Sequence, residues 1–60
     1  MSLMSVAEVA DFLGVQVVRV ERLERESLLI AKEKDEDGKP LFDSEVVEKY
    51  KVFAERLGGI

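Results

Sequence analysis

The sequence predicts a mainly α fold with a small β-hairpin, of the winged helix-turn-helix class. Three observations predict it. A helix-start motif with an apolar stripe precedes Gly14, an Asp-Gly dipeptide at 37–38 marks a hairpin, and a long apolar stripe occupies residues 46–57. The expected elements are helices at about 6–13, 16–26 and 44–57, with the hairpin, or wing, at about 30–42.

The first helix has signals at both ends. Ser5 and Glu8 have the S-x-x-E spacing of a capping box, in which each side chain satisfies a free backbone amide at a helix start. Gly14 supplies the left-handed backbone that ends a helix. Between them, the apolar residues repeat at helical spacing and predict one buried face: Val6, Val9, Ala10 and Leu13. A second helix therefore follows after a very short turn.

The second predicted helix, at about 16–26, has an apolar side and a basic side. Val20 and Leu23 are its expected inward positions. Three basic residues lie three apart, so they drift slowly around the helix and form one ridge: Arg19, Arg22 and Arg25. Three acidic residues interrupt this ridge and cancel its formal charge: Glu21, Glu24 and Glu26. The positive surface is therefore local.

A hairpin is predicted after the connector at 27–29. Its candidate strands are Ile30–Lys34 and Lys39–Phe42. Asp37-Gly38 is a dipeptide favoured where both central residues of a turn need positive φ. Pro40 cannot donate a hydrogen bond to a neighbouring strand, so we expect it on an exposed edge.

The last helix is expected to be capped by Asp43 or Ser44 and closed by Gly58-Gly59. Its apolar residues form the strongest helical period in the chain and predict a face packed on the first two helices: Val46, Val47, Tyr50, Phe53, Ala54 and Leu57. Phe12 and Phe42 are further core candidates.

Length and composition limit the possible functions. Sixty residues make one domain, and so short a domain often needs a partner subunit. Cys and His are absent, which excludes disulfides and zinc fingers. The segment from Glu33 to Asp37 imitates the start of a calcium loop, but Ser44 stands where a bidentate Glu is required. We expect a cytoplasmic protein that does not span a membrane and is not an enzyme. We also expect it to bind no cofactor, metal or small-molecule ligand. Residues 1–3 are expected to form a leader without ordered structure or function.

Two segments carry a family resemblance. Residues 5–15, SVAEVADFLGV, resemble the opening helix and turn of the MerR/excisionase superfamily, and residues 38–50, GKPLFDSEVVEKY, are similar to its wing exit and following helix. Residues 41–56 also resemble the DNA-binding domain of lambda-type phage terminase small subunits. Both resemblances imply a module that binds double-stranded DNA, as a homodimer or multimer, in transcription, recombination or packaging.

The resemblance also implies the residues that contact DNA. The recognition helix of the family corresponds to residues 16–25, which would enter the major groove, with Arg22 as the leading candidate. The wing would lie on the adjacent DNA backbone. The full predicted set is Gln16, Val18, Arg19, Arg22, Arg25, Lys32, Lys34 and Lys39.

A second hypothesis comes from features that oppose DNA binding. The net charge is −4, and the wing tip Asp35-Glu36-Asp37 places three carboxylates where phosphates would lie. Val17-Val18 stands where polar or basic residues are usual in the family. The alternative is therefore a protein–protein interaction module on a winged-helix scaffold with little DNA affinity. A continuous positive face joining Arg19, Arg22 and the wing lysines would favour DNA binding, and carboxylates interleaved throughout that face would favour this alternative.

Overall fold

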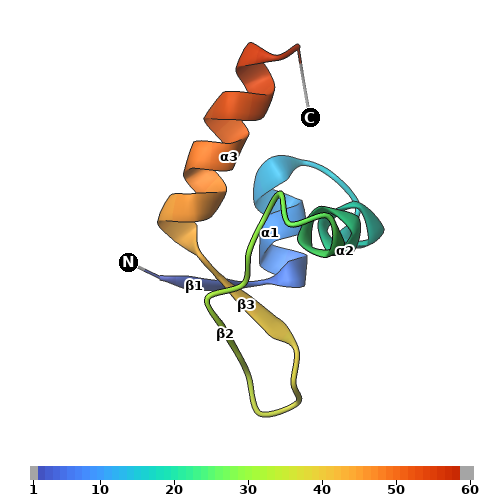
Figure 1. The fold of residues 1–60 in the computed structure, drawn as a ribbon, viewed down its shortest axis with the longest axis vertical. Coiled ribbons are helices and arrows are strands. Elements are labelled where there is room, and N and C mark those ends of the chain that lie inside the picture. Colours follow the sequence, from blue (N-terminus) through green and yellow to red (C-terminus); the bar gives the residue numbers. More distant parts are fainter. Residues whose placement is uncertain (1, 59–60) are drawn as a thin grey trace.

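The computed structural model describes residues 2–58 and contains three helices and a three-stranded antiparallel sheet. The elements follow in the order β1 (Leu3–Ser5), α1 (Val6–Leu13), α2 (Val17–Arg25), β2 (Glu33–Lys34), β3 (Pro40–Asp43) and α3 (Ser44–Arg56). Figure 1 shows α1 and α2 side by side in the middle of the molecule, with the β2–β3 hairpin and α3 at opposite ends. The predicted mainly α fold with a small wing is confirmed.

The helix-turn-helix pair is built by the predicted local signals. The Ser5 hydroxyl accepts a hydrogen bond from the Glu8 amide at 3.2 Å, and the Glu8 carboxylate accepts one from the Ser5 amide at 2.9 Å. Gly14 has φ of +74°, and the next amide, that of Val15, donates to the Ala10 carbonyl at 2.9 Å. This compact end of α1 leaves three residues, 14–16, before α2 begins.

The hydrophobic core lies where α1, α2 and the sheet meet. The predicted inward residues of α1 and α2 are buried except Val6, which is half-buried, and Phe42 of β3 is fully buried. The core consists of Val9, Ala10, Leu13, Val20, Leu23, Leu29, Phe42 and Val47. Within residues 2–58 no buried polar side chain interrupts this apolar cluster. Its continuity fixes the orientation of α2, whose opposite side remains exposed.

The sheet contains a strand that sequence reasoning missed. The strand order is β1-β3-β2, and the register of β1 on β3 sets Leu3 opposite Asp43 and Ser5 opposite Leu41. The Ser2 carbonyl also accepts a hydrogen bond from the Ser44 amide at 2.8 Å. The prediction of a leader without ordered structure was therefore wrong for Ser2 and Leu3, while Met1 lies outside the described residues.

Pro40 lies in β3, the central strand of the sheet, but at the end where β3 pairs with β2 alone, so its other side is the expected open edge of the two-stranded wing. The structure accommodates it because β1 ends at Ser5, opposite Leu41, one residue before β1 would reach Pro40. On the side of β3 that faces β2, the Lys39 carbonyl accepts a hydrogen bond from the Asp35 amide at 2.9 Å. The backbone groups of successive residues in a strand point to alternate sides, so those of Pro40 point away from β2. The nitrogen of Pro40 therefore points past the end of β1, where no strand requires a donor.

The wing is shorter than predicted, and its turn is of another type. Ile30–Lys32 lies outside β2, since the buried Leu29 holds the chain before it in an irregular connector. Gly38 has φ of +81°, but Asp37 does not have positive φ. The Asp35 carboxylate accepts hydrogen bonds from the amides of Asp37 and Lys39, both at 2.9 Å. This side-chain cap stabilises a three-residue loop, in which only the glycine needs the left-handed conformation.

Helix α3 packs differently from the prediction. Asp43 is its N-cap, and Val47 and Ala54 are buried, whereas three residues expected to face the core are exposed: Val46, Phe53 and Leu57. Phe12 is also partly exposed, with the Lys51 ammonium 4.6 Å from the centre of its ring. Figure 1 shows that α3 projects beyond the helix pair, which explains the exposure of Phe53 and Leu57 at its C-terminal half but not that of Val46 in its first turn. The helix ends at Arg56, with Gly58 at φ of +106°, and Gly59 lies outside the described residues.

We predict that Phe42→Ala destabilises the domain by about 3–5 kcal/mol, because it empties the largest fully buried position of the core. Most small domains have a free energy of unfolding of about 5–15 kcal/mol, so the variant is expected to unfold at a much lower urea concentration. Far-UV circular dichroism during urea titration measures this change. The exposed Ile30→Ala serves as the control, and equal urea midpoints for the two variants would show that β3 does not anchor the core.

Candidate nucleic-acid interface

The exposed side of α2 gathers most of the predicted DNA contacts. Burial of Val20 and Leu23 turns the opposite side of the helix outward. One shallow surface groove is lined by five of the predicted residues together with Val15: Gln16, Val18, Arg19, Arg22 and Arg25. Gln16 is the N-cap residue of α2, but its side chain makes no capping hydrogen bond. Its amide group therefore remains available at the helix start.

The guanidinium groups in this groove are accessible. Arg22 pairs with Glu26 one turn later, with Nε 3.4 Å from Oε2, and its side chain is 68% exposed. A surface pair of this kind contributes only about 0.2–1 kcal/mol, so a phosphate or a base edge can displace it. Within residues 2–58 neither Arg19 nor Arg25 takes part in an ion pair. The arginine ridge is thus a solvated surface and not an internal ion-pair network.

The side of α2 that faces the wing is acidic. A groove between α2 and the wing is lined by Val6, Glu21, Glu24, Arg25 and Pro40. A neighbouring groove contains Val17 and Glu21 of α2 with Asp35 and Lys39 of the wing. Val17 and Val18, adjacent in sequence, therefore line different grooves. Glu21 and Glu24 therefore stand between the wing and the pair Arg19 and Arg22, whereas Arg25 lines both this groove and the arginine groove.

The three predicted wing lysines are not brought together. Lys39 lines the groove beside Val17 and Glu21, at the N-terminal end of α2. Lys34 is exposed on β2 opposite Pro40. Lys32 lies on a different surface, in a groove with Leu28, Ile30 and Val46. Of the three, only Lys39 lines a groove that α2 shares with the wing.

Lys32 is held there by an ion pair with the cap of α3. Its ammonium lies 3.5 Å from the Asp43 carboxylate, whose other oxygen accepts a hydrogen bond from the Glu45 amide at 2.9 Å. The amide hydrogen bond, followed by the Lys32 interaction, lowers the pKa of Asp43. Asp43 thus uses its charge to begin α3 and to hold the connector, and Lys32 pairs with it on a surface away from α2.

One of the three carboxylates at the wing tip, that of Asp35, has a structural role. The Asp35 carboxylate accepts hydrogen bonds from two backbone amides of its own turn.

Within residues 2–58 no group of three or more acidic side chains is arranged to hold a metal ion. None of the three helices there has the length and apolar character needed to cross a bilayer.

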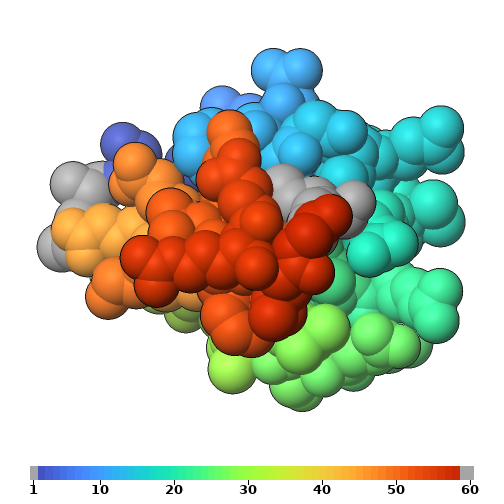
Figure 2. Space-filling model, turned by 90° about the horizontal axis from the view of Figure 1, so that it is seen from above, coloured from blue at the N-terminus to red at the C-terminus, as the bar shows by residue number. Residues whose placement is uncertain are grey.

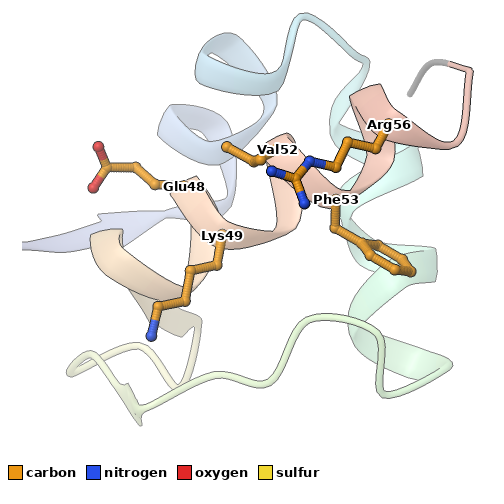
Figure 3. A pocket seen from close by; sticks show the side chains of 5 residues that line it. All are labelled: Glu48, Lys49, Val52, Phe53 and Arg56. Atoms are coloured by element: carbon orange, nitrogen blue, oxygen red, sulfur yellow. The ribbon is translucent and has the colours of Figure 1, made fainter.

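Sequence reasoning missed two surface features. The first is the position of Glu21 and Glu24 beside the wing, which depends on how the hairpin folds back. The second is a groove on α3, lined by Glu48, Lys49, Val52, Phe53 and Arg56 (Figure 3). Helical periodicity shows that these residues share a side of the helix, but it does not show whether another element covers them.

Comparison with protein-family models, curated proteins and solved structures finds no match to this chain.

We predict that Asp43→Asn reduces stability at neutral pH and that its difference from the wild type narrows in acid. The folded pKa of Asp43 is lowered, so the stabilisation is complete above the unfolded pKa of about 3.9 and is lost as pH falls through the lower folded value. Thermal melts followed by circular dichroism from pH 7 to below pH 4 (about the carboxyl pKa) measure the difference. Asp11→Asn on exposed α1 is the control, and a constant gap across this range for Asp43→Asn would contradict the prediction.

Proposed function

We propose that this chain is a double-stranded DNA-binding module in which α2 enters the major groove. The observation that carries the proposal is the single groove on the exposed side of α2 where Gln16, Arg19, Arg22 and Arg25 meet. In a helix-turn-helix, the second helix reads base edges with residues near its N-terminus while the first crosses the backbone. Here the second helix has its exposed cations and one free amide side chain on the same side.

The chemistry of these side chains suits base and phosphate contacts. A guanidinium can donate two hydrogen bonds to a guanine edge or to a phosphate, and a glutamine amide can pair with an adenine edge. With nine residues, α2 is about 14 Å long, which covers about four base pairs. The methyl groups of Val18 suit contact with a thymine methyl. The helix therefore supplies both positioning and base-reading groups.

The wing contributes less than predicted. Lys39 and Lys34 can meet the DNA backbone beside α2, whereas Lys32 is paired with Asp43 on another surface. Glu36 and Asp37 at the wing tip are exposed and repel phosphate. We therefore place the interface on α2 and Lys39, and we expect affinity for arbitrary sequences to be weak and strongly dependent on salt.

We predict that a random-sequence duplex binds with an affinity whose logarithm falls linearly with the logarithm of salt concentration, with a slope of about −0.9 for each phosphate engaged. Fluorescence anisotropy with a labelled duplex measures it. After selection of a preferred sequence, Arg22→Ala is expected to weaken binding by about 1–3 kcal/mol. Lys32→Ala removes the same charge from the other surface and is the matched control. Equal affinities for the two variants would remove α2 as the recognition helix.

A second candidate is a protein-interaction module, and one observation favours it. Glu21 and Glu24 line the groove between α2 and the wing, where they flank Arg25, so the positive surface from Arg19 and Arg22 to the wing is not continuous. If α2 faces DNA, these carboxylates oppose binding. If α2 faces a protein, they are part of a mixed-charge docking surface.

We predict that Glu21→Gln with Glu24→Gln raises affinity for random-sequence duplex DNA by about threefold to tenfold, because it removes repulsion beside the phosphates. The matched control is Asp11→Asn with Glu55→Gln, which changes net charge equally on α1 and α3. The same anisotropy titration measures both. A wild type without salt-dependent binding, together with no gain in the Glu21/Glu24 variant, would favour the protein-interaction candidate.

A further inference from the structure

Glu26 is a carboxylate at the end of α2 where the helix dipole favours cations. It is the C-cap residue of the helix, so its charge opposes the dipole. Its side chain is 49% exposed and contributes nothing to the hydrophobic core. Neither the stability of α2 nor the packing of the core accounts for an acidic residue at this position.

The backbone holds Glu26 in a fixed place. Its amide donates a hydrogen bond to the Arg22 carbonyl at 2.9 Å. The chain then turns at Ser27, which has φ of +62°. The Leu29 amide donates to the Leu23 carbonyl at 3.2 Å, and the Leu29 side chain is fully buried. Glu26 is therefore anchored one helical turn beyond Arg22.

The contact between the two side chains leaves the outer end of the arginine free. Oε2 of Glu26 accepts a hydrogen bond from Nε of Arg22 at 3.4 Å. Within residues 2–58 this is the one hydrogen bond that the guanidinium makes, so both of its terminal nitrogens can donate elsewhere. Arg19 and Arg25 form no ion pair in the described part of the chain. Arg22 is thus the arginine of the groove that another side chain orients.

A guanine edge and a phosphate would meet this pair differently. An end-on contact, in which the two terminal nitrogens donate to a guanine edge, keeps the hydrogen bond from Nε to Glu26. A side-on contact through Nε breaks it, and the carboxylate repels a phosphate that comes close. An arginine that is already oriented also loses less rotamer entropy on binding. Figure 2 shows side chains of α2, in teal to green, projecting from the right-hand edge of the molecule, away from α3 in orange and red.

We propose that Glu26 is a positioning residue of the interface, which orients Arg22 for end-on contact with a guanine and disfavours its contact with phosphate. Glu26 acts through Arg22 and not by touching DNA. The inference rests on the proposed DNA-binding function and deepens it, because it names the base that Arg22 reads. It also assigns specificity, at the expense of affinity, to an acidic residue.

The ratio of the affinities for a selected sequence and for a random-sequence duplex, measured by fluorescence anisotropy at one salt concentration, tests the proposal. Glu26→Ala is expected to bind the random duplex more tightly, but to lower the ratio by about twofold to fivefold, the value of an exposed ion pair. Glu26→Gln is expected to keep most of the ratio, because its amide oxygen can still accept from Nε. Glu24→Ala removes the same charge from α2 without touching Arg22. This matched control is expected to raise both affinities alike.

Two further measurements separate positioning from a general effect of charge. In an Arg22→Ala background, Glu26→Ala is expected to leave the ratio unchanged, since no guanidinium remains to be oriented. In the free protein, NMR relaxation of the Arg22 Nε–H group is expected to show more motion in Glu26→Ala than in the wild type or Glu26→Gln. Circular dichroism verifies that every variant folds.

The outcomes distinguish this inference from the proposed function. An unchanged ratio in Glu26→Ala, an equal fall of the ratio in the Arg22→Ala background, or equal Nε–H motion with and without the carboxylate would each overturn the role of Glu26 while DNA binding stands. A wild type that binds neither duplex would overturn the proposed function and this role together.

Discussion

Burial of Phe42 is the constraint on which the rest of the structure depends. Its side chain is fully buried, and its strand, β3, lies between β1 and β2 and runs directly into α3. One position thus connects the N-terminus, the wing and the last helix to the helix-turn-helix pair. Since the same core includes Val20 and Leu23, the packing around Phe42 also decides which side of α2 faces solvent.

The parts of the fold that were predicted correctly are encoded within short stretches of sequence. The capping box of Ser5 and Glu8, the left-handed Gly14 and the inward residues of α2 each need only a few neighbouring residues. β1 was missed because its three residues have no recognisable period and its partner is β3, about 40 positions away in the sequence. The turn type was missed because it depends on the Asp35 side chain accepting hydrogen bonds from its own loop.

The candidate site could likewise be predicted where it depends on residues close together in the sequence, but not where it depends on distant ones. The helical phase of α2 places Arg19, Arg22 and Arg25 on one side, and the structure agrees. Whether wing lysines join that side depends on the path of the hairpin, and here Lys32 is held by Asp43 instead. For α3, periodicity identifies an apolar side but not its partner. Phe53 therefore reads as a core residue in the sequence and is exposed in the folded monomer.

Net charge alone does not decide whether this domain can bind a polyanion. The chain carries −4, yet Arg19 and Arg22 lie on one edge of α2 and Glu21 and Glu24 on the other, with Arg25 bordering both, so the field near the helix differs from the average over the surface. The few cations on that edge imply weak binding by a single copy.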